Sequence, residues 1–207
     1  MKVLCLILAR SGSLRLKNKN FRKINGKSLF EKTLYFAKKC KFIKKIYLST
    51  NDELLINKYK NMVLIPWKRP NKYSNSKSSS NSAIIHFLRW YKKKVKKKLD
   101  IILLLQPTSP FRNLETFKKA LFLLKKNMKC SVVGISPIKF NKNSKKKIII
   151  DNKQYFVNGS LYLSSIKYFL KYKSFFSKKT SYIIQETKRE SIDIDTKKDL
   201  IKARLLA

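Results

Sequence analysis

Apolar residues along the chain occur in two patterns. Short continuous apolar runs predict buried strands of the kind found in parallel sheets that are covered on both faces. These runs span Lys2–Ala9, Lys45–Thr50, Met62–Pro66, Ile101–Leu105 and Cys130–Ser136. Between them, apolar residues recur at the spacing of one helix face, which predicts amphipathic helices. The predicted helices span Leu29–Lys41, Asn51–Tyr59, Ala83–Lys98 and Asn113–Met128.

The remaining segments are less regular. Lys68–Ser82 is rich in Ser, Asn, Lys and Pro, which predicts a loop, and Asn141–Asn152 is a lysine-rich excursion. Tyr155–Leu163 combines a glycine with alternating aromatic residues. Ser191–Asp195 alternates and predicts a short strand, and Thr196–Leu206 predicts a closing helix. No repeat or linker interrupts this order, so we expect a single domain over residues 1–207.

The alternation of strands and helices predicts an α/β fold with three α/β/α layers, in which helices cover both faces of a mostly parallel sheet. In such sheets, ligands bind beyond the carboxyl ends of the strands. The loops that follow Ala9, Thr50 and Leu105 are therefore expected to meet at one edge of the sheet and to hold the ligand.

The chain is strongly basic, with 50 Lys and Arg against 11 Asp and Glu and a formal net charge of +39. This charge suits a polyanionic partner such as nucleic acid, an anionic membrane or a phosphorylated ligand. It is also typical of a compositional bias toward Lys, Asn and Ile, because the lysines are spread along the whole chain. The sequence has no RNP box, GXXG loop or zinc finger, so we expect no nucleic acid as the main partner.

The counts of histidine and cysteine exclude several chemistries. His86 is the only histidine, which removes any multi-histidine metal site, and we expect it to be structural. Cys5, Cys40 and Cys130 form no CxxC pair, and such sparse thiols favour a reducing compartment. The apolar run Val3–Ala9 is far shorter than the roughly 20 residues that span a bilayer. We therefore expect a cytoplasmic protein without a membrane segment.

The segment Ala9–Asn20, which follows the first predicted strand, is small, polar and basic. It carries a Ser-Gly-Ser turn together with Arg10, Arg15, Lys17 and Lys19. Backbone amides around such a turn can bind phosphate oxygens, and the cationic side chains neutralise them. The segment is neither a Walker A loop nor a GxGxxG loop. It predicts a phosphate site, with a basic surface loop as the alternative.

Five of the eleven acidic residues fall within fourteen residues near the end of the chain. They are Glu186, Glu190, Asp193, Asp195 and Asp199. In so basic a protein, this cluster is the place where a cation would be held. The alternative is that the acids neutralise nearby lysines at the surface, which we favour for Glu186 and Glu190.

Ala9–Asn20 resembles A-R-S-G-S-x-R-x-x-N-K-N, the opening motif of the acylneuraminate cytidylyltransferases, or CMP-sialic acid synthetases. Further segments are similar to later motifs of this family, in order and at suitable spacing. They are Gly26–Leu29, Ser49–Asp52, Arg69–Pro70 with Ser74 and Ser79–Ser80, Leu105–Arg112, Asn158–Gly159 with Tyr162, and Ser191–Thr196 with Asp199. The match covers most of residues 1–135 and 156–206, and L-Q-P-T-S-P-x-R together with S-I-D-I-D-T makes it specific.

The resemblance implies a Rossmann-like nucleotidyltransferase fold, similar to glycosyltransferase-A, and a nucleotidyl transfer. In that reaction the anomeric hydroxyl of a sialic-acid-like nonulosonate attacks the α-phosphorus of CTP in line. A CMP-sugar and pyrophosphate are released, for use in surface-glycan biosynthesis. Catalysis then depends on positioning and charge neutralisation, with no covalent intermediate. The expected ligands are CTP, a keto sugar acid and Mg²⁺.

The functional residues of the family fall on matching positions of this chain. The resemblance implies nucleotide binding by Arg10, Ser11, Gly12, Ser13, Arg15, Lys19, Asn20, Arg69 and Ser80. It implies sugar binding by Gln106, Asn158 and Tyr162. The expected catalytic residues are Arg10, Lys19, Asp193 and Asp195.

Asp193 and Asp195 are also the expected metal ligands. Alternate side chains of an extended strand share one face and lie about 6.6 Å apart. Two carboxylates on one face can hold Mg²⁺ against phosphate oxygens, and the family uses the matching pair in this way. The alternative is a pair of acids on the solvent face of a strand.

Several positions depart from the family pattern. Leu14 replaces a lysine that contacts phosphates in relatives, Lys17 replaces a proline, and Ser76 replaces an aspartate. Phe156 stands where many relatives have an arginine that helps to bind the sugar acid. The segment 138–157 is shorter than its counterpart, which supplies sugar contacts and a dimerisation arm.

Two alternatives stay open, the first because of these departures and the second because of the net charge. One is a nucleotide-binding relative with impaired catalysis, such as a sensor or a partner subunit. The other is a basic polyanion-binding protein. A homodimer stays possible but is disfavoured by the short segment.

Overall fold

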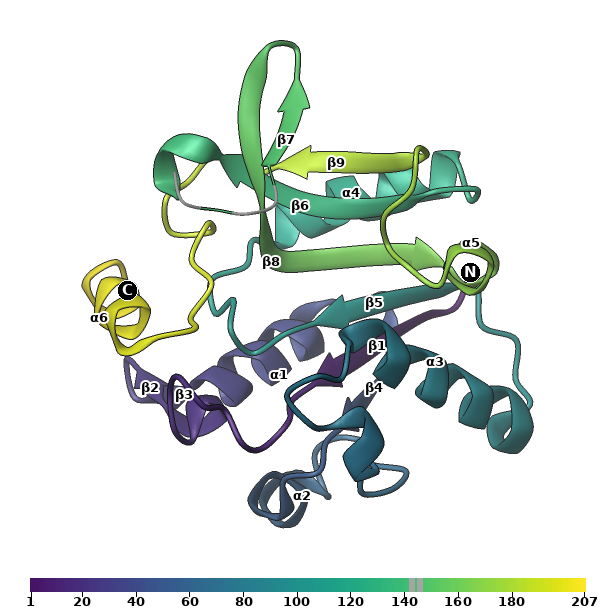
Figure 1. The fold of residues 1–207 in the computed structure, drawn as a ribbon. Coiled ribbons are helices and arrows are strands. Elements are labelled where there is room, and N and C mark those ends of the chain that lie inside the picture. The colour runs from purple at the N-terminus through teal and green to yellow at the C-terminus, as the bar shows by residue number, and fades with distance from the viewer. Residues whose placement is uncertain (142–143, 145–146) are drawn as a thin grey trace.

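The computed structural model describes residues 1–141, 144 and 147–207, and one large sheet runs through it (Figure 1). Within these residues, seven strands join in the order β4-β1-β5-β8-β6-β9, with β7 paired to β8. Their bounds are β1 Val3–Leu8, β4 Ile43–Ser49, β5 Ile101–Leu105, β6 Ser131–Pro137, β7 Lys147–Ile150, β8 Lys153–Ser165 and β9 Thr180–Ile184. β2 Lys23–Ile24 and β3 Lys27–Ser28 form a separate small hairpin.

The sheet is mostly parallel, as predicted. β1 lies between β4 and β5 and is parallel to both, and β6 is parallel to β9. β8 lies between β5 and β6 and runs antiparallel to them. The carboxyl ends of β1, β4 and β5 therefore meet at one edge of the sheet, which is where an open parallel sheet binds ligands.

Helices cover both faces of the sheet and complete the three predicted layers (Figure 1). α1 and α4 pack on one face, where Phe30 and Phe117 join a core cluster with Cys5 of β1. α3 and α5 pack on the other face, where Phe87 belongs to a second cluster with Leu6 of β1. The helix bounds are α1 Leu29–Lys39, α2 Glu53–Tyr59, α3 Ser80–Trp90, α4 Leu114–Lys126, α5 Ile166–Tyr172 and α6 Lys197–Leu205.

Polar residues fix where α1, α4 and α6 begin. Ser28 and Glu31 form a capping box at the start of α1, and Thr196 and Asp199 form another at the start of α6. Asn113 accepts a hydrogen bond from the backbone of Glu115 at the start of α4. Such caps satisfy backbone amides that have no partner inside the helix.

Two predicted strands are wrong. Among the described residues, Met62–Pro66 makes a single isolated bridge to β4, between Leu64 and Tyr47. Ser191–Asp195 is irregular, and the Ile194 amide donates to the Thr108 carbonyl at 2.8 Å. Among the described residues, Ser191–Asp195 pairs with no strand of the sheet, so its alternation alone does not make a strand.

The predicted helix over Ala83–Lys98 is shifted in the structure. α3 begins earlier, because the Ser79 hydroxyl accepts a hydrogen bond from the Ser82 amide and caps the helix. It ends at Trp90, and a π-helical turn over Tyr91–Val95 follows. The end falls where lysines crowd at helical spacing, and like charges at that spacing destabilise a helix.

The last third of the chain contains elements that the sequence patterns did not predict. α5 and β9 are two of them. β8 contains the whole aromatic segment Tyr155–Leu163. Part of the lysine-rich excursion Asn141–Asn152 forms β7, whereas residues 142–143 and 145–146 lie outside the described residues.

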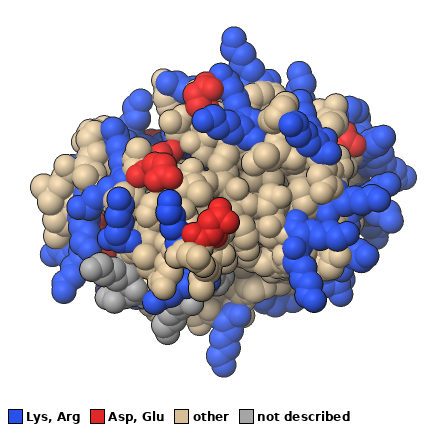
Figure 2. Space-filling view, turned by 90° about the horizontal axis from the view of Figure 1, so that it is seen from above, with Lys and Arg blue, Asp and Glu red and all other residues tan. Residues whose placement is uncertain are grey.

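Lysine and arginine side chains project all around the rim of the face shown in Figure 2, and a few acidic side chains lie on its largely uncharged centre. This spread agrees with a compositional bias better than with one basic groove. Across the described ranges, we find no helix that is both long and apolar enough to cross a membrane.

Candidate active site

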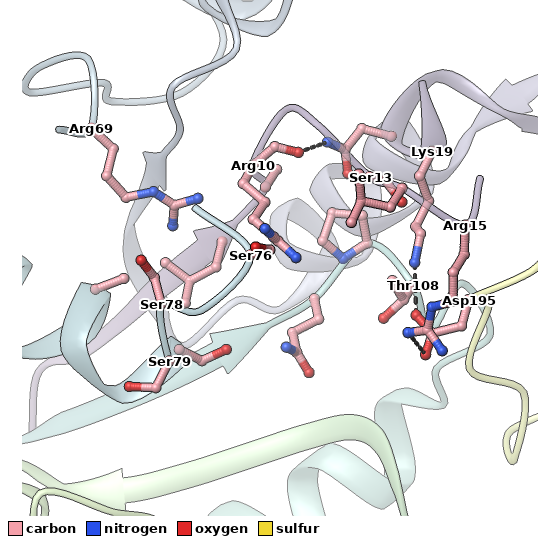
Figure 3. A pocket seen from close by; sticks show the side chains of 18 of the residues that line it. Arg10, Ser13, Arg15, Lys19, Arg69, Ser76, Ser78, Ser79, Thr108 and Asp195 are labelled. Carbon is pink, nitrogen blue, oxygen red and sulfur yellow. Dashed lines mark hydrogen bonds and ion pairs between the residues drawn. The ribbon is translucent and has the colours of Figure 1, made fainter. Parts of the chain in front are cut away.

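A cleft of about 590 Å³ opens at the carboxyl ends of β1 and β5 (Figure 3). Three loops and the segment before α6 line it. The lining residues are Leu8, Ala9, Arg10, Ser13, Leu14, Arg15, Lys19, Asn20, Arg69, Tyr73, Ser76, Ser78, Ser79, Ser80, Ala83, Gln106, Pro107, Thr108, Asp193 and Asp195. The cleft thus lies at the sheet edge that the sequence predicted.

Polar contacts attach the loop after β1 to the loop after β4. The Ser11 amide donates to Asn51 Oδ1 at 3.0 Å, and Asn51 Nδ2 donates to Ser11 Oγ at 2.8 Å. Asn20 Nδ2 donates to the Arg10 carbonyl at 3.0 Å. Ser11 and Gly12 do not line the cleft among the described residues. In the structure they shape the loop that carries the cationic side chains.

Asp195 lies against two cations of this loop. Arg15 Nη2 is 2.6 Å from Asp195 Oδ2, and Lys19 Nζ is 2.7 Å from Oδ1 (Figure 3). Burial acts to raise the pKa of Asp195, but the hydrogen bonds and charges of Lys19 and Arg15 outweigh it and hold the pKa below its usual range. Asp195 is therefore ionised at neutral pH.

Asp193 faces the cleft in different surroundings. The residue is exposed to the cleft, but neighbouring protein atoms partly desolvate its carboxylate and raise its pKa. A hydrogen bond with Thr108 opposes the shift in part. Gly159 lies close by: a Cβ added there would be 3.4 Å from Asp193 Oδ2 and 3.1 Å from Ser109 Oγ.

Arg69 enters the cleft from the opposite wall (Figure 3). Its side chain is buried, and Nε donates to Ser74 Oγ at 3.0 Å. Burial, together with the nearby charge of Arg10, lowers the pKa of Arg69 to about 10, so the guanidinium remains charged at neutral pH. Ser80 starts α3 on the same wall, and helix N-termini favour anions.

The three predicted sugar-binding residues fall in different places. Gln106 lines the cleft, but Asn158 and Tyr162 are not among its described lining residues. Asn158 Nδ2 donates to Ser136 Oγ at 2.8 Å and to Gln185 Oε1 at 2.5 Å, inside the protein. The Tyr162 ring is 5.4 Å from that of a core phenylalanine, and burial raises its pKa.

Arg112 is a half-buried cation beneath the cleft to which the sequence patterns gave no role. Its Nε donates to the Ser160 carbonyl at 2.8 Å, and its Nη2 donates to the Gln106 carbonyl at 2.5 Å. Nη1 donates to Thr33 Oγ1 at 3.2 Å. Burial lowers the pKa of Arg112 to about 10. It ties β8, α1 and the end of β5 together and so fixes the cleft floor. Its place in the L-Q-P-T-S-P-x-R motif was the available signal.

Other lining residues were also missed. Tyr73, Ser78 and Thr108 face the cleft, and only the last belongs to a strong motif. Leu14 lines the cleft with 84% of its surface exposed. An apolar side chain thus stands where the resemblance leads one to expect a phosphate-binding lysine.

The arrangement suits a polyphosphate and a hard cation. Four cationic side chains and two carboxylates line the same cleft. Mg²⁺ is commonly bound by one or two carboxylates together with phosphate oxygens of a substrate, and this donor set fits that requirement. The fold and the cleft are those of a nucleotide-binding α/β protein of the nucleotidyltransferase class.

Comparison with known proteins identifies the family. A family model described as Cytidylyltransferase matches residues 4–206, so the chain belongs to the cytidylyltransferase family. It is 32% identical to a CMP-N,N'-diacetyllegionaminic acid synthase of Legionella pneumophila, over 95% of this chain and 92% of that protein. It is 30% identical to an N-acylneuraminate cytidylyltransferase of Streptococcus agalactiae, over 97% of this chain and 52% of that protein.

A solved structure shows the same fold. A CMP:2-keto-3-deoxy-manno-octonic acid synthetase in complex with CTP has a TM-score of 0.76 to this chain and covers it completely, with 98% of its own chain covered. Sequence identity between the two is 14%. The predicted nucleotidyltransferase fold is thereby confirmed.

Proposed function

We propose that the protein transfers CMP from CTP to the anomeric hydroxyl of a sialic-acid-like nonulosonate and releases pyrophosphate. The observation that carries this proposal is the convergence of Arg10, Lys19 and Arg69 with Asp193 and Asp195 in one cleft. The family match and the relatives that are named as legionaminic acid and acylneuraminate enzymes support it. The expected product is a CMP-sugar for glycan biosynthesis.

The cationic residues are proposed to bind the nucleotide. Arg10, Arg15 and Lys19 lie on the loop after β1 and would neutralise the triphosphate. Arg69 and Ser80, on the opposite wall, would hold the cytidine end. Nucleotidyl transfer needs little covalent chemistry from the protein, so positioning and charge stabilisation would supply most of the rate enhancement.

Asp193 and Asp195 are proposed to hold Mg²⁺. Their oxygens are the donors that this ion prefers, and both side chains face the cleft. When bound, the ion would polarise the phosphates and stabilise the leaving pyrophosphate. Asp195 is anchored for this role, because its amide donates to Asp199 Oδ2 at 3.1 Å.

On the sugar side, Gln106 is the proposed contact that already faces the cleft. Tyr162 and Asn158 remain proposed sugar-side residues. For Asn158, a direct contact would require it to give up its bonds to Ser136 and Gln185.

Pyrophosphate release tests the proposal directly. The four nucleoside triphosphates are each combined with a panel of keto sugar acids that includes acylneuraminate, legionaminate and pseudaminate. We expect release with CTP and at least one nonulosonate. No release with any of these acids would contradict the proposed reaction.

The variant Asp195→Asn tests the assigned carboxylate. We expect a fall in kcat of about 10²-fold or more, in line with the loss of one transition-state charge contact. Asp151→Asn makes the same chemical change at an exposed turn between β7 and β8 and should keep full activity. Full activity of Asp195→Asn would remove the metal assignment.

A nucleotide-binding relative with impaired catalysis is the second candidate, and the exposed Leu14 in the cleft favours it. Calorimetry separates the two candidates. Binding of CTP without turnover on any acid of the panel would support the second one.

We also propose that the protein acts in the cytoplasm. Cys5, Cys40 and Cys130 are free and buried, as expected in a reducing compartment. Burial raises the pKa of each thiol, which keeps the thiols protonated and unreactive.

A further inference from the structure

Each carboxylate oxygen of Asp195 contacts a cation of its own chain. One oxygen contacts Arg15 at 2.6 Å, and the other contacts Lys19 at 2.7 Å. Mg²⁺ requires carboxylate oxygens at about 2.0–2.1 Å in near-octahedral geometry. The two ion pairs and a divalent cation therefore compete for the same oxygens.

The net charge of the cleft and its small number of carboxylates both disfavour binding of a free divalent cation. Cationic side chains outnumber carboxylates among the lining residues, so a free divalent cation is repelled. Within the described part of the chain, no group of three or more His, Cys, Asp or Glu side chains lies close enough together to hold a metal ion. The two carboxylates thus do not form a complete cation site by themselves.

A nucleoside triphosphate removes both obstacles. Its phosphate oxygens are strong acceptors for guanidinium and ammonium groups, and it carries enough negative charge to reverse the sign of the cleft. The side chain of Arg15 is 65% exposed and can move, whereas that of Lys19 is only 12% exposed. Arg15 is therefore the partner that can leave Asp195 most easily.

We infer that this site takes its divalent cation only as a complex with the nucleoside triphosphate, because Arg15 and Lys19 must exchange Asp195 for phosphate before a cation can bind. The inference rests on the proposed function, since it takes the triphosphate and the metal from it. It assigns Arg15 a second role, as a positioning residue that occupies the Asp195 carboxylate until the nucleotide binds.

Titration of the nucleotide-free protein with Mn²⁺ tests this inference, with free Mn²⁺ followed by electron paramagnetic resonance. The wild type should bind weakly. Arg15→Gln should bind about tenfold more tightly, the effect of roughly one charge-assisted hydrogen bond. The gain should vanish in the double variant Arg15→Gln/Asp195→Asn, because the freed oxygens are then lost.

Arg22→Gln is the matched control. Arg22 lies near the same loop and donates to the Lys17 carbonyl at 3.0 Å. Its replacement by Gln changes the net charge by the same amount as Arg15→Gln. It should leave Mn²⁺ affinity at the wild-type value. Equal affinities of Arg15→Gln and Arg22→Gln would overturn the inference, as would tight Mn²⁺ binding by the nucleotide-free wild type.

A second measurement uses the α,β-methylene analogue of CTP, which cannot be turned over. By linkage, the factor by which the cation tightens nucleotide binding equals the factor by which the nucleotide tightens cation binding. Calorimetry with Mg²⁺ and with EDTA should give a large factor for the wild type and a smaller one for Arg15→Gln. An unchanged factor would contradict the exchange of partners.

These experiments separate the inference from the proposed reaction. Failure to release pyrophosphate would contradict the proposed transfer, but it would not alter the Mn²⁺ titration of the nucleotide-free protein. Conversely, a wild type that binds Mn²⁺ tightly without nucleotide would overturn the inference while leaving the transfer reaction intact.

Discussion

Asp193 and Asp195 are separated by one residue, yet their carboxylates differ in chemistry. Desolvation by neighbouring protein atoms raises the pKa of Asp193, whereas the pKa of Asp195 is held low by Lys19 and Arg15. Strand alternation does not orient these two carboxylates toward the cleft, because the segment Ser191–Asp195 is irregular. Ile194 fixes their position instead, because its amide donates to the Thr108 carbonyl and its side chain is buried against α6.

Gly159 supports this arrangement at the residue scale. Its φ of +76° is in the left-handed region, and a Cβ would press on Ser109 Oγ at 3.1 Å and touch Asp193 Oδ2 at 3.4 Å. We expect Gly159→Ala to lower the free energy of unfolding by about 1–2 kcal/mol from backbone strain, with a further loss from the contact. Pyrophosphate release should also fall, because the backbone that yields to this strain lies against Asp193. Denaturant unfolding and the release assay measure the two effects.

Gly26→Ala is the control for this variant. Gly26 has a φ of +73°, but nothing lies within 4 Å of its added Cβ. Gly26→Ala should lower the free energy of unfolding through backbone strain, but it should keep wild-type pyrophosphate release. Equal pyrophosphate release by the two variants would show that the contact between Gly159 and Asp193 does not matter for activity.

At the scale of elements, the start of α1 shows how a local signal fixes a helix. Glu31 accepts a hydrogen bond from the Ser28 amide at 2.7 Å and one from the Tyr59 hydroxyl at 3.0 Å. Burial acts to raise the pKa of Glu31, but these bonds, with that of Lys58, lower it to about 2. The carboxylate therefore favours the folded state only while it is ionised.

The pH dependence of stability follows from this shift. The unfolded pKa is 4.5 and the folded one is about 2, so the contribution is complete above pH 4.5 and is lost as the pH falls toward 2. Glu31→Gln should cost about 1 kcal/mol at pH 7 and almost nothing near pH 2. Urea unfolding at both pH values checks this.

Glu115→Gln is the comparison for Glu31. Glu115 pairs with Lys118 at 2.6 Å, but both side chains are exposed, and exposed pairs contribute little. Its effect should be small at either pH. A loss of unfolding free energy in Glu31→Gln that is the same at both pH values would contradict a stabilising role for the ionised Glu31 carboxylate.

At the scale of the whole molecule, charge is the dominant feature. With a formal net charge of +39, self-repulsion opposes the compact state, and salt screens it. We expect the unfolding temperature to rise between 0.05 and 0.5 M NaCl, by about 2–4 °C for each kcal/mol of repulsion removed. A fall over this range would contradict a repulsive surface.

A variant that removes surface charge makes this test specific. Lys92, Lys93 and Lys94 are exposed on the turn after α3. Their replacement by Gln should raise the unfolding temperature at low salt and reduce its dependence on salt. An unchanged salt response would mean that ion binding, and not repulsion, governs the effect.

The amino-acid sequence by itself determined the layers, the strands β1, β4, β5 and β6, most helices, and the sheet edge that holds the cleft. Apolar periodicity is a local property, and the order of elements restricts a parallel sheet to few arrangements. The sequence also placed Arg10, Lys19 and Asp195 among the candidates, and the structure brings them to one cleft.

Only the tertiary structure decided which of these side chains meet. Arg15 and Asp195 are 180 residues apart, and they touch because the segment before α6 returns to the loop after β1. Asn158 faces the interior because β8 lies antiparallel between β5 and β6. Such contacts depend on strand order and on backbone bonds between distant segments, which no local periodicity encodes.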